Sequence, residues 1–259
     1  MDKKTTSRDG TRLAYQRTGQ GPAVILISGA MSTGGTVAPL AGPLSDRFTV
    51  VSYDRRGRGE SGDTAPYAVA REVEDLAALI DVVGGEAALY GISSGGALAL
   101  HAAASGLAVR RVAVYEVPFA VYEGGVKERA EYTEHLTEAL AQGRRGDAVE
   151  LFLRLTGLAE EMIQGARQSP MWAGMEAIAP SLAYDDAVMG DGRVPRERLA
   201  SIAVPVLAMA GDASPAWMRE AAQAVAEAAP EGTYRVLEDQ THMVDPNVLA
   251  PVLAEFFAQ

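Results

Sequence analysis

The segment from Gly91 to Gly95 constrains the fold of this chain more than any other. It reads Gly-Ile-Ser-Ser-Gly, with a short apolar run before it and an alanine-rich run after it. We predict that a strand runs into Ser93 and that a helix leaves it, so the Ser93 hydroxyl projects at the carboxyl edge of a sheet. Gly91 and Gly95 flank the turn, where a Cβ would clash as strand and helix pack closely. Ser94 fits less well as the central serine, because only one of its own flanking positions is small.

Apolar segments recur on both sides of this turn and alternate with helical patterns. The segments expected to form strands are 3–7 and 13–17 (a hairpin around Asp9-Gly10), 23–28, 48–53, 87–92, 111–116, 204–210 and 233–237. The segments with helical spacing are 67–83, 94–104, 215–229 and the stretch that opens at Asp245-Pro246. This alternation predicts an α/β fold with a mostly parallel central sheet flanked by helices.

The alternation of strands and helices breaks between residues 119 and 200. Helices are predicted over 127–142 and 147–156, and a third is expected to open at Ser169-Pro170, with serine as N-cap and proline as first helical residue. The segment is too long for a simple connection. We therefore expect a core formed by residues 1–118 and 201–259, with a helical cap formed by residues 119–200.

Composition excludes several classes of protein. With 34 acidic and 23 basic residues the net charge is −11, which argues against nucleic acid or an anionic membrane surface as partner. No apolar run reaches the roughly 20 residues that a membrane span needs, and residues 1–10 are polar. The absence of cysteine excludes disulfides and thiolate metal sites. We expect a cytoplasmic protein without metal or cofactor, and its oligomeric state is open.

The three histidines have different settings. His101 lies two turns into the predicted buried helix after Ser93 and points away from the serine, so we interpret it as structural. His135 lies among glutamates and is predicted to be at the surface. His242 follows the last predicted strand, at the same sheet edge as Ser93. A serine hydroxyl needs a general base to become a nucleophile near neutral pH, and His242 is the candidate.

The sequence around these residues resembles the α/β-hydrolase superfamily, and within it the serine-nucleophile hydrolases with a helical cap. The resemblance covers the whole chain and rests on the Gly-Ile-Ser-Ser-Gly turn, the order Ser93 then His242, and residues 53–61, which are similar to the family's Asp-x-Arg-Gly-x-Gly-x-Ser segment. It implies that Asp54 and Arg56 brace loops. Haloalkane dehalogenases and epoxide hydrolases of this fold have an aspartate where Ser93 stands. Acyl transfer through a seryl ester is therefore the chemistry expected here.

The oxyanion hole departs from the family pattern. Where the family has His-Gly-x, this sequence has Ser28-Gly29-Ala30. The donors are backbone N–H groups, so the change of side chain does not remove them. By position we expect the donors to be Ala30 and Ser94.

The acid also departs from the pattern. The family's usual aspartate place holds Ser214, and Asp212 comes two residues early. Some relatives take the acid from the end of the strand after the nucleophile helix, where this chain has Glu116. A carboxylate buried there needs a partner, and His242 is the natural one. Glu116 is favoured, while Asp212, Asp239 or no acid at all stay as alternatives.

The predicted cap should supply apolar walls for a substrate. The candidates are Phe119, Met162, Met171, Trp172 and Met175, which packing between cap and core would explain equally well. The leading hypothesis is a serine hydrolase that cleaves a carboxylic ester, lactone or thioester of a small hydrophobic substrate. The alternatives are a lyase, C–C bond hydrolase, perhydrolase or cyclase that uses the same residues, and a small-molecule receptor of this fold.

Overall fold

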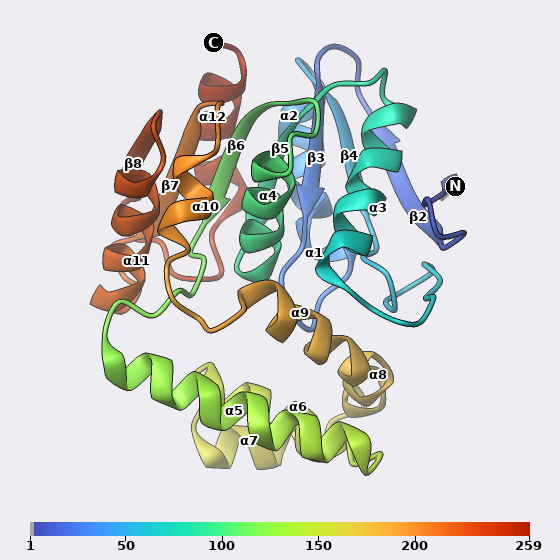
Figure 1. The fold of residues 1–259 in the computed structure, drawn as a ribbon, viewed down its shortest axis with the longest axis vertical. Helices are drawn as coiled ribbons and strands as arrows, with labels where there is room; N and C mark the ends of the chain where they lie inside the picture. The colour runs from blue at the N-terminus through green and yellow to red at the C-terminus, as the bar shows by residue number, and fades with distance from the viewer. Residues whose placement is uncertain (1–2) are drawn as a thin grey trace.

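A computed structural model describes residues 3–259 of the chain. Residues 1 and 2, which belong to the predicted core range, lie outside the described residues. Within residues 3–259 eight strands form one sheet in the order β1-β2-β4-β3-β5-β6-β7-β8 (Figure 1). The strands are β1 Lys3–Thr6, β2 Arg12–Thr18, β3 Ala23–Ile27, β4 Thr49–Tyr53, β5 Ala87–Ile92, β6 Val109–Tyr115, β7 Val206–Gly211 and β8 Gly232–Leu237. β2 pairs antiparallel with β1 and β4, and the pairs from β4 to β8 are parallel, which confirms the predicted sheet.

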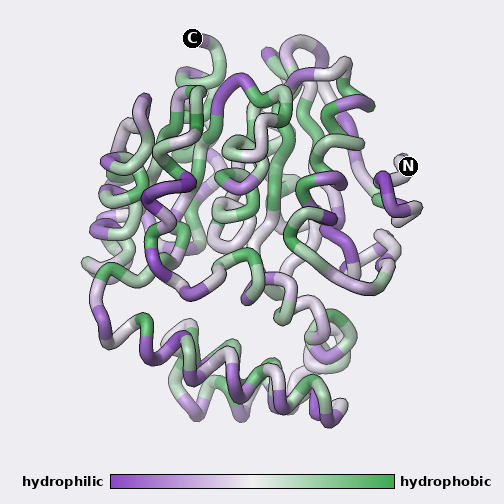
Figure 2. The backbone as a smooth tube through the Cα atoms, in the orientation of Figure 1, coloured by the Kyte–Doolittle hydropathy of each residue, from purple (hydrophilic) through white to green (hydrophobic). Residues whose placement is uncertain are grey.

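Helices cover both faces of the sheet because its strands are apolar on both sides. In β3, Ile25 and Ile27 pack into one hydrophobic cluster, whereas Val24 and Leu26 pack into the other. The helices on the first face are α3 Val69–Val82, α4 Ser94–Ala104, α10 Arg196–Ala200 and α11 Ala216–Ala228, and those on the second are α1 Gly34–Val37, α2 Ala41–Ser45 and α12 Pro246–Phe257. Figure 2 shows the hydrophobic strands between these layers. The helix α12 begins as predicted, with the Asp245 side chain accepting a hydrogen bond from the backbone N–H of Asn247.

Further helices gather below the sheet in Figure 1. They are α5 Glu123–Ala141, α6 Arg145–Leu155, α7 Glu160–Arg167 and α8 Trp172–Ile178. They share a hydrophobic cluster around Leu136, Val149 and Trp172, and Ala30 and Met31 pack against it. Because Ala30 and Met31 follow β3, these helices lie over the carboxyl edge of the sheet.

The helical segment was predicted incompletely. The helices α7, α10 and the one over residues 182–189 were missed, and α8 begins at Trp172 instead of at Ser169-Pro170. The backbone N–H of Ser169 donates to the carbonyl oxygen of Ala166. Ser169 therefore continues the turn that closes α7 and does not cap the next helix.

The helix α9 Leu182–Met189 connects the two groups of helices after the short turn Ala179–Ser181. It contacts α5 and also α3 and α4 on the sheet, while α10 contacts α4 and α11. Both α9 and α10 fall inside residues 119–200, so a separate cap over that range stays a prediction. Within residues 3–259 no helix combines the length and hydrophobicity that crossing a membrane requires.

Candidate active site

The turn between β5 and α4 holds Ser93 in a strained conformation. Its backbone has φ 55° and ψ −130°, a region that non-glycine residues rarely adopt. A Cβ on Gly95 would lie 2.5 Å from the carbonyl oxygens of Ile27 and Ser28, and one on Gly91 would overlap the backbone of Gly95. The predicted close approach at both glycines is confirmed, and it leaves the Ser93 side chain at the carboxyl end of β5.

The Ser28-Gly29-Ala30 segment lies beside this turn. It leaves β3, which pairs with β4 on one side and β5 on the other, so the strand order reverses here. Open α/β sheets bind ligands in the crevice at such a reversal. A Cβ on Gly29 would lie 3.0 Å from the Cβ of Ser93 and 3.6 Å from its Oγ. The loop that carries Ala30 therefore runs along the Ser93 side chain.

Glu116 follows β6 and is fully buried. Its Oε2 lies 2.8 Å from His242 Nδ1, and its Oε1 accepts a hydrogen bond of 2.9 Å from the backbone N–H of Gly211. The backbone N–H of Ser93 donates to the carbonyl oxygen of Tyr115, at 2.9 Å. The serine turn and Glu116 thus sit at neighbouring strand ends, and the loop after β8 brings His242 to Glu116.

The surroundings of Glu116 keep its carboxylate ionised. Burial raises the pKa of Glu116, but the hydrogen bonds with His242 and with the N–H of Gly211 lower it below its ordinary value overall. Asp212 instead accepts a hydrogen bond of 2.7 Å from the backbone N–H of Asp239. Of the acid positions considered, Glu116 is the one that hydrogen-bonds His242, and its role in catalysis stays a prediction.

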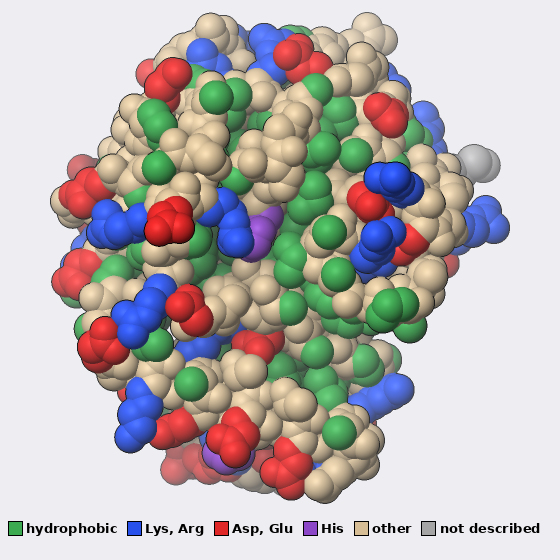
Figure 3. Space-filling view, in the orientation of Figure 1, with side chains coloured by type: hydrophobic (Ala, Val, Ile, Leu, Met, Phe, Trp, Pro, Cys, Tyr) green, Lys and Arg blue, Asp and Glu red, His purple; other side chains and the backbone are tan. Residues whose placement is uncertain are grey.

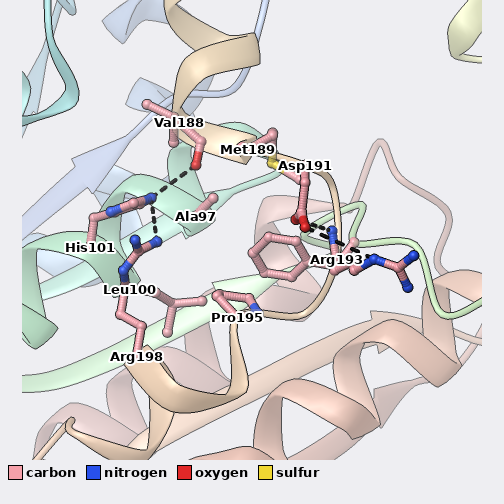
Figure 4. A pocket seen from close by; sticks show the side chains of 11 residues that line it. Ala97, Leu100, His101, Val188, Met189, Asp191, Arg193, Pro195 and Arg198 are labelled. Atoms are coloured by element: carbon pink, nitrogen blue, oxygen red, sulfur yellow. Dashed lines mark hydrogen bonds and ion pairs between the residues drawn. The ribbon is translucent and has the colours of Figure 1, made fainter. Parts of the chain in front are cut away.

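The other two histidines lie apart from this pair. His101 Nε2 lies 2.9 Å from the carbonyl oxygen of Val188, and burial lowers the pKa of its ring, which fits a structural role. It lines a cavity of about 190 Å³ beside α9, with Arg198 at its rim, and Ser93 and His242 are not among the lining residues (Figure 4). His135 is exposed on α5, as predicted.

The five residues proposed as substrate walls do not form one pocket. Phe119 is buried in a sheet cluster and lines the His101 cavity, whereas Trp172 and Met175 pack in the cluster of the lower helices. Met162 and Met171 are 61% and 74% exposed. Figure 3 shows side chains of both charges dispersed over the core and over the lower helices, with hydrophobic side chains between them. Contact of these five residues with a substrate stays a prediction.

Three arginines within residues 55–58 are buried. Arg56 pairs with Asp75 and Asp9. The Asp54 carboxylate accepts hydrogen bonds from the backbone N–H groups of Gly34 and Glu60. Both residues therefore brace loops, as predicted.

The sequence analysis assigned no contacts to Arg55, Arg58 or their partner Asp185. Arg55 makes a two-pronged ion pair with Glu72, with both N···O distances 2.7 Å. Arg55 and Arg58 also both bind Asp185 on α9. The density of arginines between two apolar strands was the available signal, since a buried cation requires a carboxylate partner.

The sequence matches the model of the alpha/beta hydrolase family over residues 24–252. This chain belongs to the alpha/beta hydrolase family. An alpha/beta hydrolase from Sphaerobacter thermophilus of known crystal structure is 51% identical, covers 98% of this chain and 100% of its own, and superposes with a TM-score of 0.89. The chain is a hydrolase, as predicted.

Two curated relatives resemble this hydrolase less closely. The 3-oxoadipate enol-lactonase 1 of Acinetobacter baylyi is 29% identical over 223 residues, which cover 81% of this chain and 79% of the relative. The pimeloyl-[acyl-carrier protein] methyl ester esterase of Stenotrophomonas maltophilia is 41% identical over 98 residues, or 38% of this chain and 36% of that enzyme.

The arrangement in this hydrolase suits acid–base chemistry by side chains. An ionised carboxylate that accepts from Nδ1–H fixes a neutral histidine in the tautomer whose Nε2 can take a proton. Across residues 3–259 no group of three or more His, Asp or Glu side chains is arranged to hold a metal ion.

Proposed function

We propose that this hydrolase cleaves a carboxylic ester, lactone or thioester of a small hydrophobic substrate through a seryl-ester intermediate. The observation that carries the proposal is the 2.8 Å hydrogen bond between Glu116 and His242, formed at the sheet edge that presents Ser93. The names of the two curated relatives, an enol-lactonase and a methyl ester esterase, support this substrate class.

In the proposed reaction Ser93 Oγ attacks the substrate carbonyl carbon while His242 Nε2 takes the hydroxyl proton. Glu116 holds Nδ1–H and stabilises the imidazolium that forms. The carbonyl oxygen becomes an oxyanion, which the backbone N–H groups of Ala30 and Ser94 stabilise. The carbon–oxygen or carbon–sulfur bond then breaks, and His242 returns the proton to the leaving group. Water, deprotonated by His242, attacks the carbonyl carbon of the seryl ester. The bond to Ser93 Oγ then breaks, His242 donates its proton to that oxygen, and the acid leaves.

The experiment is a panel of p-nitrophenyl esters of increasing chain length, with lactones and thioesters beside them. The Ser93→Ala variant should lose at least a thousand-fold in kcat. Ser105→Ala is the matched control, because Ser105 is an exposed serine at the end of α4. A fluorophosphonate should add its mass to the wild type and the control but not to Ser93→Ala. Turnover that survives Ser93→Ala, or wild type that stays unlabelled while active, would contradict the seryl-ester route.

A further inference from the structure

Asp185 lies on α9, buried against the core. Its Oδ1 accepts hydrogen bonds from Ser94 Oγ and Arg55 Nη1, each 2.7 Å long. Its Oδ2 accepts one of 2.6 Å from Arg58 Nη2. One carboxylate therefore binds the residue after Ser93 with one oxygen and an arginine with the other.

The arginine carries this connection to the oxyanion loop. Arg58 Nη1 donates to the carbonyl oxygen of Gly29 at 2.6 Å, and the Ser32 hydroxyl donates to the same oxygen at 2.7 Å. The carbonyl of Gly29 and the N–H of Ala30 belong to one planar trans peptide, so they point in opposite directions. When Arg58 fixes the carbonyl on the buried side, it fixes the Ala30 N–H toward the opposite side.

The second predicted donor is tied to the same carboxylate. Ser94 is the first residue of α4, and its backbone N–H is the group expected to face the oxyanion. Its side chain is buried and donates to Asp185, so a bond to a buried charge holds Ser94 in place at the start of α4. The carbonyl of the same peptide accepts from the N–H groups of Gly96 and Ala97, which fixes the direction of the Ser94 N–H.

We propose that Asp185 is a positioning residue that sets the two oxyanion donors, Ala30 N–H and Ser94 N–H, relative to each other. This inference rests on the proposed function. Asp185 touches no reacting atom, and it acts through Arg58 on one donor and through Ser94 Oγ on the other. Because the donors bind the oxyanion more strongly than the ground-state carbonyl, their misplacement lowers kcat more than it changes KM.

The helix α9 makes this arrangement part of the link between core and lower helices (Figure 1). The next residue, Asp186, accepts hydrogen bonds from Arg129 and Thr133 on α5. Two adjacent residues of α9 thus bind different parts of the molecule: Asp185 binds the core, and Asp186 binds α5. Asp186 is a matched control, since it is an aspartate on the same helix with an arginine and a hydroxyl partner and no bond to the oxyanion loop.

The test compares Asp185→Asn with Asp186→Asn on the best p-nitrophenyl ester of the wild type. An asparagine at 185 can still accept from Ser94, but its amide N–H group then faces Arg58, and two donors repel. We expect kcat to fall about ten- to a hundred-fold with KM within about twofold, as for a displacement of roughly 1 Å. The inhibition constant of an alkylboronic acid, which forms a tetrahedral adduct with serine, should rise by the same factor. Asp186→Asn should change neither value more than about twofold.

Two outcomes overturn the inference while the wild type stays active. In the first, Asp185→Asn has the same kcat as Asp186→Asn. In the second, Asp185→Asn changes kcat and KM by the same factor and leaves the affinity for the boronic acid unchanged. If Asp185→Asn does not fold, Arg58→Lys replaces it, because lysine keeps the charge and cannot reach Gly29 and Asp185 together. A loss of at least fivefold in kcat at constant KM then supports the inference, and no loss overturns it. A wild type without any ester turnover would instead contradict the proposed function.

Discussion

Replacing Glu116 with glutamine tests the proposed acid with little change in shape. The carboxylate accepts from His242 Nδ1 with one oxygen and from the N–H of Gly211 with the other. A glutamine amide cannot reproduce both bonds. If its oxygen faces His242, its NH₂ group meets the Gly211 donor, and if the amide flips, its NH₂ group donates to Nδ1. The flipped form places the imidazole proton on Nε2, where the base must be free.

The magnitude of the loss follows from two effects. Carboxylate and imidazolium charges about 4 Å apart attract each other by about 4 kcal/mol at an effective dielectric constant of 20, which corresponds to roughly a thousand-fold in rate. The unfavourable tautomer lowers the rate as well, and the corresponding amide substitution in serine proteases costs about 10⁴ in kcat. We therefore expect Glu116→Gln to lose about 10³–10⁴ in kcat.

The assay measures ester turnover per reactive serine. The number of reactive serines is titrated by long incubation of the wild type with a fluorophosphonate. Turnover that comes from traces of other esterases is then recognised. Asp212→Asn is the matched control. It removes a carboxylate from the loop after β7 while its amide oxygen can still accept from the N–H of Asp239. We expect this control to stay within about threefold of the wild type. The assignment of Glu116 would be refuted by a Glu116→Gln variant that keeps more than a tenth of the activity, or by a larger loss in Asp212→Asn.

Two further predictions concern pH and packing. Burial raises the pKa values of Glu72, Glu116 and Asp185, but arginines or hydrogen bonds lower each below its ordinary value. The stability that these groups contribute is therefore fully present above about pH 5 and is lost as the pH falls through their pKa values in the folded state. Urea unfolding of the wild type and of Glu116→Gln at pH 7 and pH 4 measures this loss, and the free energy of unfolding should change less with pH in the variant. Gly95→Ala should lower the free energy of unfolding by about 2–3 kcal/mol, because its Cβ would lie 2.5 Å from two carbonyl oxygens of the Ile27–Ser28 segment; an unchanged urea midpoint would contradict the close approach.

The sheet could be predicted from the sequence because its signals are local. The run Ala23–Ile27 is apolar at every position, and the glycines around Ser93 mark a turn that tolerates no Cβ. The helix α7 was missed because its single buried residue, Ile163, gives almost no periodic pattern. Met162 is predicted to contact a substrate because it is apolar, and the structure shows it 61% exposed, which the sequence pattern could not indicate because exposure depends on packing.

The Asp185 network shows a different limit. Arg55 and Asp185 are 130 positions apart, and their contact depends on how α9 docks on the core. Local sequence patterns do not indicate contacts between residues so far apart in the chain. Two adjacent aspartates on a short helix are also typical of a solvent-exposed face. The buried arginines were the only indication, because each of them requires carboxylates from elsewhere in the chain.

Backbone strain within residues 3–259 concentrates at one edge of the sheet. The non-glycine residues with positive φ there are Met31, Ser93, Glu116 and Asp239, with φ from 45° to 56°. They follow β3, β5, β6 and β8, all at the carboxyl ends of parallel strands. Such conformations cost about 1–3 kcal/mol each and persist only where the surroundings fix them.

The sheet supplies that constraint. The N–H groups of Ser93 and Glu116 donate to Tyr115 and Met209 on the neighbouring strands, so the ladder continues one residue past each strand before the chain turns. The turn then points the serine hydroxyl and the Glu116 carboxylate away from the ladder. If these residues continued the strand, their side chains would point into one of the packed faces of the sheet. Stability from the parallel sheet thus offsets the strain of aiming these two side chains at one edge, which is why the candidate chemistry gathers where the strands end.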